Sequence, residues 1–138
     1  MIMVQGAEWG MLGHPMTRQD LDSVCADLPL ALFSPDHHTV WANTIALERA
    51  GILHGGVTDT GHEIVMAADG TATGQLNEVS AYAAVLALSG EGRIMQPLST
   101  GEQPDPAPTP AERASALVRL RAGLAHCAAH GITTLINM

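Results

Sequence analysis

The sequence contains no lysine, and this absence excludes several kinds of site. Within these 138 residues there is no Schiff-base lysine, no P-loop lysine and no carbamylated lysine that bridges two metal ions. Fourteen carboxylates stand against six arginines and give a formal charge of −8, which argues against a surface that follows nucleic-acid phosphates. The same charge balance excludes a basic helix lying on a membrane surface.

Cysteine and aromatic residues are also scarce, and no apolar run is long. The sequence has two tryptophans, one tyrosine and one phenylalanine, so aliphatic residues and seven methionines must fill the core. The two cysteines, Cys25 and Cys127, match no zinc spacing or redox pair and are interpreted as buried thiols. Nowhere do the roughly 18 apolar residues of a membrane helix run together, and the first residues lack a signal-peptide pattern. We therefore expect a cytoplasmic protein.

Capping residues and apolar runs predict the first elements of the chain. Thr17 has the spacing of a helix cap and predicts a short helix over residues 18–26. Residues 30–33 form a compact apolar run of strand length. A second helix is predicted over residues 43–50, with an asparagine cap and a glycine directly after it. Trp41 is interpreted as an anchor that packs the intervening segment onto the core.

The middle of the chain is predicted to form a hairpin and a helix. Residues 63–66 and 73–76 flank an Asp-Gly pair, which supplies the positive φ that a hairpin turn needs. Residues 78–89 have apolar side chains at helical spacing and a glycine placed to end the helix. Residues 101–110 contain four of the prolines and predict an extended, polyproline-like connector.

The C-terminal part carries the clearest helix signal. A capping box at residues 109–112, with proline at the first helical position, predicts a helix that Gly131 ends. Residues 132–136 are β-branched and apolar and predict a strand parallel to residues 30–33. This helix-to-strand step is typical of an α/β fold, but the strands are too few to close a barrel, which needs about 250 residues. The apolar stripe of the helix consists of Leu117, Leu120, Leu124 and Ala128.

Asp36, His37 and His38 directly follow the predicted strand 30–33. A hard oxygen and two imidazoles at a strand end suit a divalent metal or a proton-shuttling group. Neighbouring side chains on an extended segment point to opposite sides, so at most one of the two histidines faces a shared site. The alternative, which spacing alone favours, is a loop in which these side chains satisfy turn amides.

Other titratable residues also have two interpretations. Glu78 begins a predicted helix, where the amide dipoles favour a carboxylate whatever else it does. His126 and His130 have a metal-compatible spacing of one helical turn, but the C-terminal end of a helix also favours a protonated histidine. His54 and His62 are interpreted as solvated. From the residues alone the function stays open.

Several blocks of sequence, taken in order, resemble the amidohydrolase superfamily. The most similar branch is the family 3 group, which includes N-substituted formamide deformylases and D-aminoacylase-like enzymes. The order matters more than any single block, because the matches span nearly the whole chain. The blocks are Met-Thr-Arg-Gln-Asp-Leu-Asp at 16–22, Asp-His-His-Thr-Val-Trp-Ala-Asn-Thr at 36–44, Asp-Gly-Thr-Ala-Thr-Gly-Gln-Leu-Asn-Glu at 69–78 and Gly-Ile-Thr-Thr-Leu at 131–135.

The resemblance implies an incomplete, TIM-barrel-like α/β fold with a β-hairpin insertion. Residues 1–138 would be one fragment of an amidohydrolase domain, with 1–108 inserted between early barrel strands and 109–138 forming a helix and strand of the barrel. The implied reaction is hydrolysis of a C–N bond in a small amide-type substrate by water that a divalent ion, expected to be zinc, activates. The family's His-x-His and later ligands would lie outside these residues, so the chain alone is expected to be inactive.

By the same resemblance, Asp36, His38 and Asn43 are expected to bind substrate, and Glu78 to be a metal ligand or to support one. The family's glycine between the aspartate and the histidine is His37 here. We expect neither nucleic acid nor membrane as a partner, while unpaired strand edges leave a homo-oligomer open. The competing hypothesis is a truncated, non-catalytic remnant or a protein-interaction module.

Overall fold

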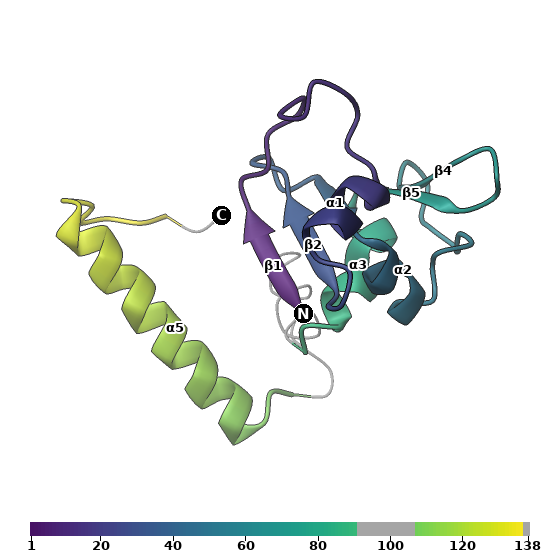
Figure 1. Ribbon diagram of the computed structural model, residues 1–138. Coiled ribbons are helices and arrows are strands. Elements are labelled where there is room, and N and C mark those ends of the chain that lie inside the picture. Colours follow the sequence, from purple (N-terminus) through teal and green to yellow (C-terminus); the bar gives the residue numbers. More distant parts are fainter. Residues whose placement is uncertain (91–106, 137–138) are drawn as a thin grey trace. The chain divides into compact units, whose positions relative to one another are not determined.

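A computed structural model describes residues 1–90 and 107–136 and divides the chain into two compact units, Met1–Gln96 and Pro97–Met138. Among the described residues, the first unit has five strands and three helices, and the second has one long helix (Figure 1). No helix among the described residues is long and apolar enough to cross a membrane.

The first unit is built on an open, mixed five-stranded sheet with the strand order β1-β2-β3-β5-β4. Strand β1 lies parallel to β2, as Figure 1 shows, and the other neighbours are antiparallel. The described strands thus form an α/β structure that is not a closed barrel. The strands are β1 (Ile2–Gln5), β2 (Leu30–Phe33), β3 (Thr39–Ala42), β4 (Glu63–Met66) and β5 (Ala72–Asn77).

The described helices of this unit begin within one residue of their predicted starts. Helix α1 (Arg18–Val24) has a capping box at Thr17 and ends two residues earlier than predicted. Asn43 caps α2 (Thr44–Arg49), whereas α3 (Val79–Ala87) is separated from β5 by Glu78 alone and has no side-chain cap. The predicted hairpin is confirmed as β4 and β5.

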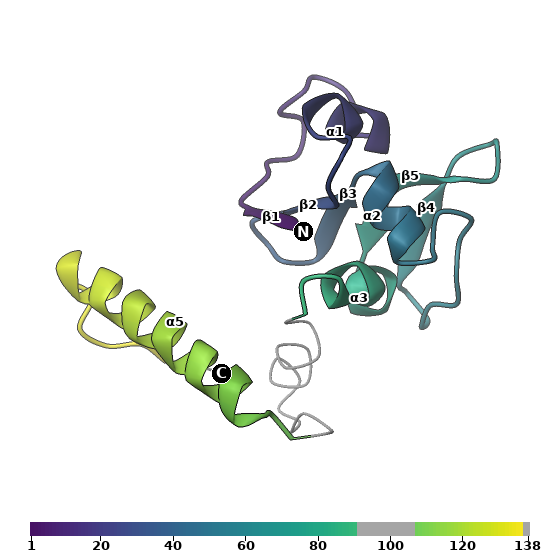
Figure 2. The same cartoon turned by 60° about the horizontal axis from the view of Figure 1, so that its bottom comes forward.

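Apolar side chains cover both faces of the sheet. On one face, α2 and α3 pack against β5, as can be followed in Figure 2, and Val40 and Leu76 are fully buried there. On the other face, Trp41 packs with Met16 and Leu21 in a second cluster beneath α1 and the loop before it. Neighbouring residues of β3 point to opposite faces, and both faces are covered. All four residues of this strand are therefore buried.

The prediction of a strand over residues 132–136 is wrong. These residues form no strand, and the two edges of β2 are already taken by β1 and β3. A strand exists only through its partner's hydrogen bonds, so β-branched composition is not sufficient. Strand β1, which the sequence patterns did not predict, occupies the position parallel to residues 30–33.

The second unit confirms the predicted C-terminal helix. Helix α5 (Pro110–Ala129) has the capping box between Thr109 and Glu112 and proline in its first turn. None of its side chains is buried, including the four of the predicted apolar stripe. Of the predicted proline-rich connector, residues 101–106 lie outside the described residues.

Candidate functional site

His38 and Glu78 face each other although they stand 40 positions apart. Thr39 of β3 is paired with Asn77 of β5, so the residue before β3 meets the residue after β5. The backbone N–H of Glu78 donates to the carbonyl of His38 at 2.8 Å. Their side chains also meet, with Nδ1 of His38 3.1 Å and 3.2 Å from the two carboxylate oxygens. Antiparallel pairing of β3 and β5 therefore brings the two residues together.

The backbone of Glu78 is strained. Its φ of 68° and ψ of 163° fall in a region that glycine alone enters readily. Such a conformation costs on the order of 1–3 kcal/mol and persists only where the surrounding structure imposes it. The Glu78 side chain makes no capping bond to α3, although the residue stands at the N-cap position. The side chain therefore does not cap the helix, and its carboxylate is turned to His38.

The contact changes the protonation of the imidazole. The hydrogen bond to Glu78, and then its negative charge, raise the pKa of His38. Both side chains are accessible, with 65% of His38 and 36% of Glu78 exposed. An ion pair this exposed contributes little to stability, so its main effect is to favour the imidazolium. Glu78 thus shifts the His38 imidazole toward its charged form, at the solvent-accessible end of the two inner strands β3 and β5.

Asp36 fixes the loop that presents His38. Its carboxylate accepts a hydrogen bond from the hydroxyl of Ser34 and another, at 3.0 Å, from the backbone N–H of His38. The Ser34 bond, followed by the His38 amide, lowers the pKa of Asp36. This arrangement corresponds to the turn-amide alternative for Asp36. The carboxylate acts on the site through the position of His38.

His37 occupies the strained position of the same loop. Its φ is 63°, in the left-handed region that favours glycine, and the Tyr82 hydroxyl donates to its carbonyl at 3.1 Å. The resemblance places glycine at this position, and the backbone gives a physical reason for it. Phe33 and Tyr82 lie close to the loop, with their ring centroids 5.7 Å apart.

The structure does not bring Asn43 together with these residues. Asn43 follows β3 and His38 precedes it, so the two stand at opposite ends of the strand. Asn43 is fully buried, and its Oδ1 accepts from the amides of Leu30 and Ala46, both at 3.0 Å. Its Nδ2 donates to the carbonyls of Cys25 and Leu28. All of its polar atoms are engaged inside the fold, which gives Asn43 an architectural role.

The described residues do not fit a complete metal site. Among them, no three histidine, cysteine, aspartate or glutamate side chains converge on a point that could hold an ion. A catalytic zinc ion takes three protein ligands. His38 and Glu78 supply one nitrogen and one carboxylate, and these two groups bind each other. Any ion at Glu78 would need further ligands from outside the described residues.

A row of polar side chains leads along the sheet from Glu78 and was missed by the sequence patterns. Oδ1 of Asn77 accepts from the Thr39 hydroxyl at 3.3 Å and from Nε2 of Gln75 at 3.0 Å. Nδ2 of Asn77 donates to Glu63 at 3.3 Å. The alternation of polar and apolar residues in β5 was the available signal, since it places Gln75 and Asn77 on one face.

The family follows from comparison with known proteins. The sequence model of the amidohydrolase family matches residues 1–138. This chain belongs to the amidohydrolase family. Membership of this family indicates hydrolase activity, and amidohydrolases generally use divalent metals. Neither the curated proteins nor the solved structures gave a match to this amidohydrolase sequence.

Proposed function

We propose that this chain is a portion of a metal-dependent amidohydrolase that hydrolyses a C–N bond, of amide or formamide type, in a small-molecule substrate. The observation that carries the proposal is the family match over all 138 residues. The resemblance of the ordered blocks favours the branch with N-substituted formamide deformylases and D-aminoacylase-like enzymes. In this proposal residues 1–108 are a segment inserted between early barrel strands.

His38 is proposed to act on the substrate as a proton donor. Nδ1 holds the proton shared with Glu78, which leaves Nε2 of the imidazolium to donate to the carbonyl oxygen or to the departing nitrogen. Glu78 favours the charged form of the imidazole, and Asp36 holds the loop in place through the His38 amide. The strained backbone of Glu78 supports this assignment, because such strain clusters at functional sites.

The metal, proposed to be zinc, supplies Lewis-acid activation of water in enzymes of this kind. Glu78 is the residue of this chain proposed to contact it. The sequence contains no His-x-His, the pattern of the family's first ligands. The remaining ligands would therefore come from other parts of a longer polypeptide, and the 138 residues by themselves are expected to show no turnover.

The test compares two proteins encoded at the same locus. One is the 138-residue chain, and the other is the product of the longest reading frame that contains it. Both are assayed with Zn²⁺ on N-formyl and N-acetyl amines. We expect turnover that EDTA abolishes from the longer protein alone, and a loss of about 100-fold or more in kcat for its His38→Ala variant, as for a general acid. Turnover by the short chain, or none by a folded longer protein that contains His-x-His, would contradict the proposal and favour a non-catalytic remnant.

A further inference from the structure

A separate cleft lies on the face of the sheet that α1 and the loop before it cover. A cleft of about 610 Å³ opens between this loop, Trp41 of β3 and Gln75 of β5. Neither His38 nor Glu78 lines it, although Gln75 of the polar row next to Glu78 does, and ligand binding in this cleft can be measured without any assay of turnover. Apolar side chains dominate its walls, chiefly Trp9, Met11, Leu12, Met16 and Trp41.

The two tryptophans give the cleft its shape. Their ring centroids are 4.8 Å apart and their planes meet at 74°, so one ring packs edge-on against the other. Trp41 is 2% exposed and is held by its strand, whereas Trp9 is 53% exposed. Trp9 is therefore an accessible aromatic surface fixed by a buried one. Trp9 is therefore the ring that can face a cation, and Trp41 supports it from beneath.

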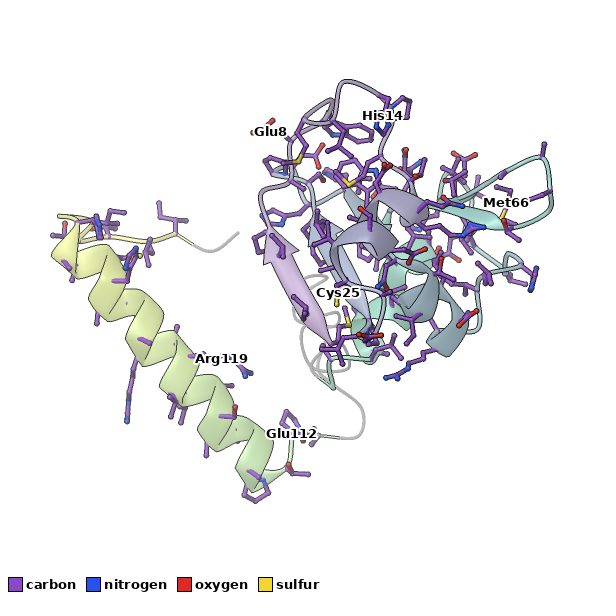
Figure 3. All side chains as sticks on the ribbon, in the orientation of Figure 1. Glu8, His14, Cys25, Met66, Glu112 and Arg119 are labelled. Carbon is purple, nitrogen blue, oxygen red and sulfur yellow. The ribbon has the colours of Figure 1, made fainter. Side chains whose placement is uncertain are left out.

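The charges around the cleft favour a positive ligand. Within the described part of the chain, Glu8 and His14 are the titratable residues that line it, and Figure 3 shows them on the β1 side and the α1 side of the loop. Nε2 of His14 lies 3.7 Å from Asp20, so a proton on His14 is balanced by a neighbouring carboxylate. No arginine among the described residues lines the cleft, and the chain carries a formal charge of −8. A carboxylate ligand would meet repulsion, and a cation would meet Glu8.

From these features we infer that the cleft binds a small organic cation with an apolar body, such as an aryl-alkyl ammonium. The cationic head lies over the Trp9 ring within reach of Glu8, and the apolar body packs against Met11 and Met16. Tryptophan offers the strongest ring for a cation, and thioethers adapt to apolar shapes. The neutral amide of Gln75 completes the wall without adding charge.

The probe for this site is benzyltrimethylammonium, with benzyl alcohol and benzoate as its neutral and anionic counterparts. Trp9 and Trp41 are the two tryptophans of the chain, so a ¹⁵N-labelled sample gives two indole Nε1–H signals. Titration of the full chain with the ammonium ion should shift the Trp9 signal saturably. Its Kd should be at least about fivefold lower than that of benzyl alcohol, as a cation–π contact and one carboxylate imply. Benzoate should not bind.

Matched variants measure the contributions of the Glu8 charge and of the Trp9 ring to binding separately. Glu8→Gln should remove most of the preference for the ammonium ion over benzyl alcohol and leave the affinity for benzyl alcohol unchanged. Glu48→Gln removes the same charge from α2, away from the cleft, and should leave both affinities unchanged. Trp9→Leu should abolish binding of the ammonium ion. Equal affinities for cation and alcohol, or equal effects of Glu8→Gln and Glu48→Gln, would overturn the inference.

Discussion

Gly74 of β5 packs directly against the backbone of Arg18 in the first turn of α1. A Cβ at position 74 would lie 2.7 Å from the Arg18 amide nitrogen and 2.9 Å from the Ala42 carbonyl oxygen. Neither neighbour is a flexible side chain that could move aside. Gly74 also has a φ of +111°, which L side chains rarely adopt. The close packing of α1 against β5 therefore depends on a glycine at position 74.

Gly74→Ala should destabilise the first unit by roughly 3 kcal/mol or more, because the clash with backbone adds to the cost of the positive φ. Urea unfolding followed by circular dichroism measures the loss. Gly61→Ala is the matched control, since Gly61 has a φ of +85° and nothing within 4 Å of an added Cβ. That variant should lose about 1 kcal/mol, the cost of the left-handed backbone alone. Equal losses would show that the close approach contributes nothing.

Asn43→Ala should lower the free energy of unfolding by roughly 3 kcal/mol. The change leaves two buried backbone amides and two backbone carbonyls without their hydrogen-bond partner, and it removes the cap of α2. Asn43→Asp keeps the acceptor but turns a carboxylate oxygen toward the carbonyls of Cys25 and Leu28, so it should destabilise as well. Denaturant unfolding measures both. If Asn43→Asp were as stable as the parent protein, the two donated bonds would be unimportant.

The sequence predicted the elements whose signals are local. The capping boxes at Thr17 and Thr109 act within one helical turn, and the Asp-Gly pair acts within one hairpin, so each can be recognised in a short window. Helices α1 and α5 were predicted from these capping boxes, α2 from its asparagine cap and α3 from apolar side chains at helical spacing. The predictions failed where stability comes from distant partners. Strand β1 has four exposed residues and exists through its pairing with β2, whereas residues 132–136 have strand composition and no strand partner.

The candidate site shows the same division. His38 and Glu78 were each singled out, but their contact depends on the register between β3 and β5, which no local pattern encodes. The strain at Glu78 was also invisible, because a glutamate at a helix start looks ordinary in sequence. Asn43 was expected to bind substrate because it lies within a block that resembles the family. Its four internal hydrogen bonds give another reason for an asparagine there.

His37→Gly should stabilise the first unit by about 0.5–1 kcal/mol, because glycine enters the left-handed region without the cost that a side chain adds. The measurement is the thermal or urea midpoint. His37→Ala retains the positive φ and should bring no gain. A loss of stability in His37→Gly would instead show that the ring contact between His37 and Phe33 stabilises the fold. Their ring centroids are 6.4 Å apart.

The pairing of His38 with Glu78 should be visible in its titration. Glu78 raises the pKa of His38 above its ordinary value of 6.5, through its hydrogen bond first and its charge second. The stabilisation from this pair is therefore complete below the unfolded pKa of 6.5 and is lost as the pH rises through the higher folded pKa. Glu78→Gln should lower the pKa of His38, as followed by the NMR shift of its ring Cε1–H. Glu63→Gln removes an equal charge that does not contact His38 and should leave its titration unchanged. If both variants moved the pKa of His38 equally, the cause would be the general field of the carboxylates, and the direct contact at 3.1 Å would have no special part in it.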